Sequence, residues 1–270
     1  MRPRPAITTW GSGGSTLVFF HALLPGATGQ SIAMTARLLT ARLPVRVVGI
    51  DAPGFGSAAA APDDEYDLER LAQRLGDVAR VEAGGTFVVA GHSWGAALAV
   101  RVAADNPETV RGLVLLDGGH FDHVDLPDYD AGATVDQTLA EMDALDWWHV
   151  DHLGPLPDAW RAGLEATPDG RWRSTATPRA AAAAMNALMR GRSSTSYPTI
   201  AATGMPVLLL TATEPEQRRR DNLARTRHIS AALPHLTAHA LPGAGHDVLR
   251  DAPQRVASHI ATWWSSYLNT

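Results

Sequence analysis

The sequence predicts one α/β domain, with a mostly parallel, doubly wound sheet of about seven strands and a mainly helical insertion. Short apolar runs rich in β-branched residues alternate with amphipathic helical patterns near both ends of the chain, which is typical of buried parallel strands joined by crossover helices. One long stretch without a convincing buried strand interrupts this alternation. We therefore assign residues 1–117 and 204–270 to the core and residues 118–203 to the insertion.

The strands and helices of the core follow one another in a regular order. The apolar runs that we predict to be strands lie at residues 16–20, 45–50, 86–90, 113–116, 206–211 and 237–241. The helical patterns lie at residues 31–43, 67–82, 221–233 and 253–267, with a further one after Ser93. One strand-like segment, residues 7–10, precedes the first of these runs and brings the expected total to seven.

The insertion is expected to be helical and to carry several aromatic side chains. Its helical patterns are the segments PDAWRAGLEA and PRAAAAAMNALMRG. Trp147 and Trp148 either line a substrate pocket or pack a small core of the insertion itself. The second segment offers the apolar side chains of Met185, Leu188 and Met189 but no charged clamp for a substrate.

The composition is that of a folded protein without a surface for nucleic acid or anionic lipid. Of the 270 residues 45% are hydrophobic and 19% are charged, and the formal net charge is −5. Nucleic acid or an anionic membrane would need clustered positive charge. The longest basic run, residues 218–220, has acidic residues beside it, and we interpret it as a solvated helix face.

The absence of cysteine excludes disulfides, a thiolate nucleophile and zinc bound by cysteine. The first residues do not show the pattern of a signal peptide, and no stretch approaches the ~20 apolar residues that a membrane-spanning helix needs. On this basis we expect a cytoplasmic protein.

The segment Gly91-His92-Ser93-Trp94-Gly95 has the pattern G-x-S-x-G between a predicted strand and a predicted helix. In such a turn the glycines are needed because side chains there would collide with the neighbouring strand and helix. The serine is left exposed at the edge of the sheet, above a helix N-terminus. Ser93 is therefore the candidate nucleophile, and the alternative is a serine that only caps the helix.

A serine hydroxyl needs a base within hydrogen-bonding reach to act as a nucleophile. Of the eleven histidines, His246 is the best placed, because it lies on a glycine-punctuated loop between the last predicted strand and the last predicted helix. The alternative is a histidine whose contacts are purely structural. We expect His246 to be the base.

The stretch LLDGGHFDH, residues 115–123, raises the question of a metal site. Asp117 ends a predicted strand, and His120, Asp122 and His123 follow it. A second H-x-D-H stretch lies at residues 149–152. Neither stretch has the spacing of H-E-x-x-H, and each alone supplies few ligands. We therefore expect no metal and interpret these histidines as polar residues of the insertion.

A glycine-containing turn at residues 54–59, GFGSAA, loosely matches the fingerprint of dinucleotide-binding loops. A helix should begin directly after such a turn, but Pro62-Asp63-Asp64 interrupts it. We therefore expect no nucleotide cofactor.

Five segments of the chain, taken in their order and spacing, resemble the α/β-hydrolase fold family in its capped branch. They are HALLPGATGQ, DAPGFGSA, GHSWGA, PVLLLTA and PGAGHDVL, and the resemblance spans most of the chain. It implies that Ser93 is the nucleophile, that His246 is its base, and that a carboxylate orients the histidine.

The resemblance also implies an oxyanion hole made of two backbone N–H groups. One belongs to the residue after the nucleophile, here Trp94. The other comes from the loop after the first core strand, where His21-Ala22 stands in place of the family's His-Gly pair. We expect the Leu23 N–H to be the second donor, with Leu24 as the alternative, and His21 to hold the loop.

Two positions compete for the carboxylate. Most of the family places the acid after the strand that follows the insertion, where this sequence has Glu214-Pro215-Glu216. A minority uses the tip of the preceding core strand, where Asp117 stands. We favour Asp117, because it is short, ends a strand and is followed by Gly118-Gly119, which leave room for a histidine ring; Glu214 and Glu216 remain alternatives. The acid would accept the Nδ1–H of His246 and fix its tautomer.

The resemblance therefore implies a serine hydrolase. We expect Ser93 to form an acyl-enzyme from a carboxylic ester, lactone or thioester of a small to medium-sized, mostly apolar substrate. Proline iminopeptidase-like, carbon–carbon hydrolase or cofactor-free haloperoxidase chemistry on the same residues is an alternative, as is a ligand receptor without turnover. We expect no cofactor, a small molecule as the partner, and a monomer or homodimer.

Overall fold

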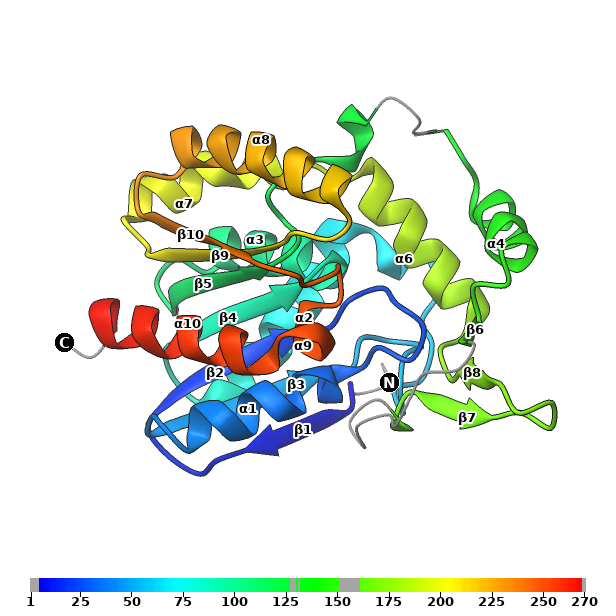
Figure 1. The fold of residues 1–270 in the computed structure, drawn as a ribbon, viewed down its shortest axis with the longest axis horizontal. Helices are drawn as coiled ribbons and strands as arrows, with labels where there is room; N and C mark the ends of the chain where they lie inside the picture. The colour runs from blue at the N-terminus through cyan, green and yellow to red at the C-terminus, as the bar shows by residue number, and fades with distance from the viewer. Residues whose placement is uncertain (1–4, 127–129, 131, 151–160, 269–270) are drawn as a thin grey trace.

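A seven-stranded sheet lies at the centre of the computed structural model, which describes residues 5–126, 130, 132–150 and 161–268. The strands are β1 (Ile7–Trp10), β2 (Ser15–Phe20), β3 (Val45–Ile50), β4 (Phe87–His92), β5 (Val110–Leu116), β9 (Val207–Ala212) and β10 (Leu236–Leu241). Their order is β1-β3-β2-β4-β5-β9-β10 (Figure 1). β1 pairs antiparallel with β3, and the other neighbours pair in parallel. The prediction of about seven mostly parallel strands is confirmed.

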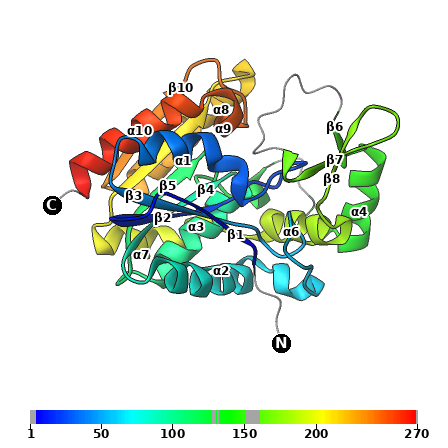
Figure 2. The same cartoon turned by 90° about the horizontal axis from the view of Figure 1, so that it is seen from below.

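Helices cover both faces of the sheet, as a doubly wound topology requires. The core helices are α1 (Ala33–Thr40), α2 (Leu68–Ala83), α3 (Trp94–Asp105), α8 (Glu216–Ala232), α9 (Val248–Asp251) and α10 (Pro253–Tyr267). Helices α1 and α10 lie on one face, and α2 and α3 lie on the other (Figure 2). Within the described residues, no helix is both long enough and apolar enough to cross a membrane.

The ends of α2 illustrate how the sequence sets these elements. The Asp67 side chain accepts hydrogen bonds from the N–H groups of Glu69 and Arg70, and so caps the first turn. Gly84, with a φ of 66°, ends the helix in the left-handed conformation that glycine adopts without strain. The observed bounds lie within one residue of the predicted range 67–82.

The turn between β4 and α3 is held by two close backbone approaches. A Cβ atom on Gly91 would lie 2.0 Å from the Gly95 carbonyl oxygen, and one on Gly95 would lie 2.2 Å from the Phe20 carbonyl oxygen. Between them Ser93 has φ 54° and ψ −117°, a conformation that is costly for a residue with a side chain. Both glycines of the G-x-S-x-G pattern are therefore required because a side chain at either position would collide with the backbone.

Replacing Gly95 with alanine is expected to destabilise the protein by about 2–3 kcal/mol or more, because the new methyl group meets backbone atoms that cannot rotate away. Chemical denaturation followed by circular dichroism measures this change. Gly85→Ala is the matched control, since a Cβ there meets no atom within 4 Å, and its stability should be unchanged or slightly raised. Equal stability of the two variants would contradict the steric account.

Most of the insertion between β5 and β9 lies beyond the carboxyl ends of the parallel strands, whereas its last helix packs against α3 and α8 (Figure 1). Its elements are the 3-10 helices η3 (His123–Asp125) and η4 (Ser193–Ser196), the helices α4 (Val135–Ala144), α6 (Pro178–Arg190) and α7 (Tyr197–Thr203), and the strands β6 (His149–Val150), β7 (Leu164–Ala166) and β8 (Trp172–Ser174). The alanine-rich segment forms α6, as predicted. Its alanines from Ala180 to Ala184 are all buried.

The three short strands form an antiparallel sheet in the order β6-β8-β7, which the sequence analysis did not predict. Residues 157–166 were expected to be helical, but the last three of them form β7, and residues 157–160 lie outside the described residues. The turn at residues 167–171 reads TPDGR, and Gly170 there has a φ of 83°. Such a Pro-Asp-Gly turn between two short segments is a hairpin signal.

The paired tryptophans of the insertion pack against each other. Their ring centroids lie 4.8 Å apart in an edge-to-face arrangement, and the buried Trp148 donates its indole N–H to Asp143. Trp148 belongs to the same apolar cluster as the alanines of α6. Of the two roles considered for Trp147 and Trp148, packing of the insertion is the one that the contacts support.

Candidate active site

Three side chains that the sequence singled out meet at the carboxyl edge of the sheet. Ser93 follows β4, Asp117 follows the neighbouring strand β5, and His246 lies in the loop after β10. The His246 Nε2 atom lies 2.8 Å from the Ser93 Oγ atom. The His246 Nδ1 atom lies 2.6 Å from the Asp117 Oδ2 atom. These are hydrogen-bonding distances between a hydroxyl, an imidazole and a carboxylate in series.

Asp117 is buried and accepts several hydrogen bonds. Its Oδ1 atom accepts from the Ala212 N–H and from the Asn222 amide, each at 2.8 Å. Its Oδ2 atom accepts from His246 and, at 3.0 Å, from Arg218. Burial alone would raise the pKa of Asp117, but the hydrogen bond and charge of His246, the Ala212 N–H and the Arg218 charge together lower it to about 2. The group is therefore an ionised acceptor at neutral pH, and His246 carries its proton on Nδ1.

The two glutamates that competed with Asp117 lie elsewhere. Glu214 and Glu216 are both exposed, and Glu216 forms an ion pair with Arg219. Among the contacts of the described residues, neither glutamate reaches His246. The structure thus brings Asp117 to the histidine and leaves both alternatives at the surface.

Helix α8 supplies two contacts to Asp117 that the sequence analysis missed. Arg218 was placed on a solvated helix face together with Arg219 and Arg220, but its guanidinium reaches Asp117 and lies 3.1 Å from His246 Nδ1. Arg219 and Arg220 are exposed, as expected. Asn222 lies four residues after Arg218, on the same side of the helix, and is buried. This spacing of polar residues was the available signal.

A buried histidine extends the contacts of Asn222. The His120 Nε2 atom lies 3.1 Å from the Asn222 Oδ1 atom, and burial lowers the pKa of His120. The neutral ring therefore donates its N–H to the amide oxygen, while the amide nitrogen donates to Asp117. His120 thereby helps to orient the group that binds the carboxylate.

His92, the variable residue before the serine, also contacts the site. Its Nε2 atom lies 2.7 Å from the backbone oxygen of His246. Burial and the neighbouring His246 lower the pKa of His92 to about 3, so its neutral ring donates the N–H to that carbonyl. The contact fixes the backbone of the loop that carries His246, and the sequence analysis did not anticipate it.

The two predicted oxyanion donors belong to buried residues. Trp94 is the first residue of α3, and Leu23 lies in the loop after β2. Among the described residues, neither N–H donates to another protein group. His21 holds this loop, as expected: its Nδ1 lies 2.8 Å from the Ala22 oxygen, and its Nε2 accepts from the Ala52 N–H at 3.1 Å.

A cavity of about 380 Å³ opens beside the serine. Its lining joins the three aligned side chains to apolar groups and to charged groups of α8. The lining residues are Ser93, Asp117, Gly118, Phe121, His123, Leu126, Pro215, Gln217, Arg218, Asp221, Arg225 and His246. The sequence suggested an apolar pocket without a charged clamp, whereas two arginines line this cavity.

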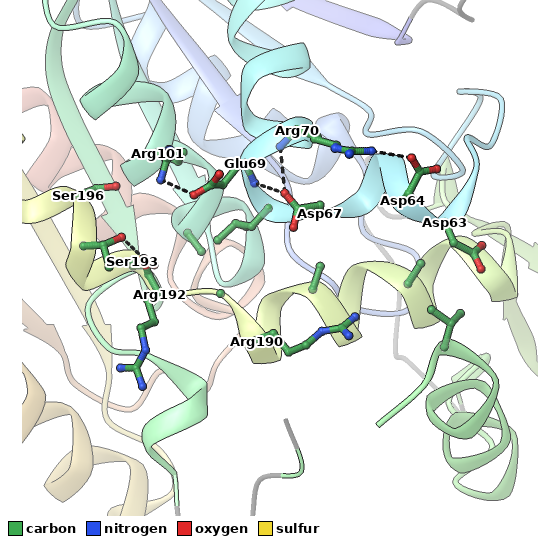
Figure 3. A pocket seen from close by; sticks show the side chains of 17 residues that line it. Asp63, Asp64, Asp67, Glu69, Arg70, Arg101, Arg190, Arg192, Ser193 and Ser196 are labelled. Carbon is green, nitrogen blue, oxygen red and sulfur yellow. Dashed lines mark hydrogen bonds and ion pairs between the residues drawn. The ribbon is translucent and has the colours of Figure 1, made fainter. Parts of the chain in front are cut away.

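A larger cavity of about 770 Å³ lies away from these residues, between the start of α2 and the end of α6 (Figure 3). Several of its charged side chains already form ion pairs, such as Arg70 with Asp64 at 2.6 Å and Arg101 with Glu69 at 3.0 Å. Ser93 and His246 do not line it. Its size therefore does not make it the reaction site.

Metal ligands do not gather in the described part of the chain. No group of three or more His, Asp or Glu side chains there has a geometry that could hold a metal ion. In the first H-x-D-H stretch, His120 binds Asn222, and Asp122 accepts from the Ser194 N–H and hydroxyl. The second stretch extends to residues 151 and 152, which lie outside the described residues.

The turn that loosely matched a dinucleotide fingerprint leads into no helix of the expected kind. Residues 57–62 after it form no helix, and the single 3-10 turn η2 (Asp63–Tyr66) separates them from α2. The Asp51 carboxylate occupies the space beside Gly56, where a Cβ would lie 2.2 Å from its Oδ2 atom. These contacts make the turn a structural one.

Asp247, the residue after His246, is a buried carboxyl group whose Oδ1 atom has no hydrogen-bond partner among the described residues. Burial, only partly offset by Arg250, raises its pKa from 3.8 to about 7. The folded state therefore keeps a proton that the unfolded state loses, and stability should fall as the pH rises from about 4 to about 7.

Asp247→Asn removes this dependence. We expect the variant to be more stable than the wild type by roughly 2–4 kcal/mol at pH 8 and to differ little at pH 4. Denaturation at several pH values measures the difference. A difference that stays constant across this range would show that the carboxyl group is not protonated in the folded state.

Comparison with known proteins shows similarity over most of the chain. A model of the alpha/beta hydrolase family matches residues 11–259. The chain is 26% identical over 250 residues to 2-(acetamidomethylene)succinate hydrolase of Mesorhizobium japonicum, covering 89% of this chain and 84% of that protein. It is 32% identical over 108 residues to an esterase of Mycobacterium tuberculosis, covering 40% and 34%.

The fold is also that of a solved esterase from Exiguobacterium antarcticum, with a TM-score of 0.74 and 15% identity over 97% of this chain and 96% of that one. The resemblance noted in five short segments thus extends over nearly the whole length of the fold. Because the family model covers most of the chain, and the sheet, its order and its helices agree with it, the chain belongs to the alpha/beta hydrolase family.

Proposed function

We propose that this alpha/beta hydrolase cleaves carboxylic esters, lactones or thioesters through an acyl-enzyme on Ser93. The observation that carries the proposal is the hydrogen-bonded series from Ser93 through His246 to Asp117 at the edge of the sheet. An imidazole hydrogen-bonded between a hydroxyl and an ionised carboxylate is the arrangement that activates a serine. The cavity beside Ser93 gives a substrate access to it.

In the proposed reaction, the Ser93 Oγ atom attacks the carbonyl carbon while its proton passes to His246 Nε2. The N–H groups of Trp94 and Leu23 hold the oxyanion of the tetrahedral intermediate. The intermediate collapses, and His246 gives the proton to the departing oxygen or sulfur. Water then attacks the acyl group, again losing a proton to His246, and the acid leaves as Ser93 regains its proton.

Asp117 has a supporting role in this scheme. It keeps the His246 proton on Nδ1 and stabilises the imidazolium that forms in each half-reaction. The hydrogen bonds from Ala212, Asn222 and Arg218 keep Asp117 ionised and fixed in place. All of these groups belong to this chain, and the scheme calls for no cofactor.

The names of the compared proteins agree with acyl hydrolysis. Two are esterases, and the third is a hydrolase of 2-(acetamidomethylene)succinate. The cavity of about 380 Å³ suits a small to medium-sized substrate. Iminopeptidase-like, carbon–carbon hydrolase and haloperoxidase chemistry would use the same three residues, but the hydroxyl–imidazole–carboxylate series alone already accounts for ester hydrolysis.

Partitioning of the acyl group tests the acyl-enzyme. Two esters with the same acyl group but different leaving groups, p-nitrophenol and phenol, are hydrolysed in the presence of methanol. A shared acyl-enzyme predicts the same ratio of methyl ester to free acid from both. A ratio that depends on the leaving group would contradict the proposal. Saturable ligand binding without turnover of any acyl compound would instead favour a receptor.

A further inference from the structure

The cavity beside Ser93 contains a second arginine, Arg225, that the proposed reaction does not use. Arg225 lies on α8, seven residues after Arg218 and therefore close to the same side of the helix. Its guanidinium carbon lies 3.8 Å from the centroid of the Phe121 ring. Stacking on the ring fixes the guanidinium plane and leaves the N–H groups at its edge free to bind a ligand.

Arg225 differs from the other half-buried arginine of the site in its contacts. Arg218 has Asp117 as a partner at 3.0 Å. No carboxylate lies within ion-pair distance of Arg225 among the described residues, and no hydrogen bond is made by its guanidinium to them. Its nearest acidic neighbour along the helix, Asp221, accepts a hydrogen bond from Gln217 at 2.8 Å. A half-buried arginine without a carboxylate partner in the protein can use its N–H groups to bind the carboxylate of a ligand.

None of the described acids around Arg225 forms an ion pair with it, and Asp221 and Asp117 act on its charge only at longer range. Burial lowers the pKa of His123 to about 4, so His123 is neutral at pH 7. Asp122 is occupied by Ser194. Asp221 also lines the cavity and opposes an anion, but it makes no ion pair with Arg225. Two further acids near Arg225 already have arginine partners, Asp117 with Arg218 and Asp125 with Arg192, each at 3.0 Å.

Arg225 also forms the boundary between two cavities. A second cavity of about 310 Å³ shares Arg225, Phe121 and Leu126 with the cavity that contains Ser93. A substrate whose carbonyl group lies at Ser93 can therefore extend along the Phe121 side and present a terminal group to Arg225. The two cavities together favour a bifunctional ligand over a simple alkyl ester.

We propose that the substrate carries a carboxylate that binds the Arg225 guanidinium while its ester or thioester carbonyl lies at Ser93. The inference rests on the proposed acyl-enzyme chemistry and narrows its substrate class to acyl compounds with a second, anionic carboxyl group. Two parallel N–H groups of the Arg225 guanidinium can donate to the two oxygens of one carboxylate. Such charge-assisted pairs are stronger than neutral hydrogen bonds.

Matched ester pairs test this inference. The mono-p-nitrophenyl esters of adipic and pimelic acid carry a free carboxylate, and their ω-carboxamides have the same shape without the charge. The wild type should prefer the carboxylate by roughly tenfold to a hundredfold in kcat/KM, after subtraction of spontaneous hydrolysis. In Arg225→Gln this ratio should fall towards one. Arg225→Lys keeps the positive charge but loses the paired N–H groups. Its ratio should lie between those of the wild type and Arg225→Gln.

Arg227→Gln is the matched control, because Arg227 is exposed on the same helix and lines neither cavity. Its kcat/KM values and its ratio should equal those of the wild type. A wild-type ratio near one, or an unchanged ratio in Arg225→Gln, would overturn the inference. If a variant does not fold, the preference of the wild type for the carboxylate over the carboxamide still tests the inference.

Failure of the acyl-enzyme proposal has a different signature. In that case neither ester is turned over, or turnover persists in Ser93→Ala. Calorimetric titration with glutarate and with glutaramide then tests carboxylate binding at Arg225 independently of turnover. Tighter binding of glutarate that is lost in Arg225→Gln would support the site, and equal binding of the two probes would overturn it.

Discussion

Replacing Ser93 with alanine is expected to lower kcat for ester hydrolysis by roughly four to six orders of magnitude. The Ser93 hydroxyl is the only group placed 2.8 Å from His246 Nε2 in the described structure, and the variant leaves water as the sole nucleophile. The loss should appear in kcat rather than in KM, because the cavity and the backbone donors remain. Steady-state kinetics with a p-nitrophenyl ester measures it.

Ser230→Ala is the control for this variant. Ser230 is exposed on α8 and bonds only to a backbone oxygen of its own helix, so its kcat should equal that of the wild type. Circular dichroism should show that both variants are folded. If Ser93→Ala keeps even a tenth of the wild-type kcat, Ser93 is not the nucleophile.

Replacing Asp117 with asparagine is expected to lower kcat by roughly 10³–10⁴-fold. The amide removes the negative charge that stabilises the His246 imidazolium. An amide N–H turned towards His246 would also favour the tautomer with its proton on Nε2, which cannot accept the proton of Ser93. Kinetics on folded protein measures the loss, with the fold verified by circular dichroism.

Glu214→Gln separates the two candidate acids. Glu214 is exposed and makes no contact with His246 among the described residues, so kcat should stay within about twofold of the wild type, as for other surface substitutions. A large loss in Glu214→Gln together with full activity in Asp117→Asn would reverse the assignment.

The elements with strong local patterns could be predicted from the sequence. The strands appear as buried apolar runs, and residues 7–10 complete the sheet as its antiparallel edge. Ser93 was identifiable because the steric demands on Gly91 and Gly95 leave a sequence pattern that can be recognised. His246 could be found from its glycine-rich loop after the last strand.

The contacts made by α8 could not be predicted in the same way. The helix begins at Glu216, whereas the sequence suggested residue 221. Its first turn faces the polar site rather than an apolar core, so no apolar periodicity marks it. Arg218 was therefore interpreted as part of a solvated helix face, and nothing in the sequence singled out Asn222 or Arg225. Only the three-dimensional structure places these residues beside Asp117 and the cavity.

The choice between Asp117 and Glu214 had the same limitation. Both acids lie between the serine and the histidine in the sequence, so the order of the residues along the chain is compatible with either. The order does not tell which carboxylate lies within hydrogen-bonding distance of His246. The small sheet of the insertion was missed because strands of two or three residues are too short to show a period.

The central claim is that Ser93 forms a covalent bond with the acyl group. A p-nitrophenyl carbamate tests it most directly, because the carbamoyl adduct of a serine hydrolase is hydrolysed slowly and accumulates. After reaction, acid quenching and digestion, mass spectrometry of the peptides should find the carbamoyl group on Ser93, with one adduct per molecule. An adduct on another residue, or ester turnover without any adduct on Ser93, would contradict the account.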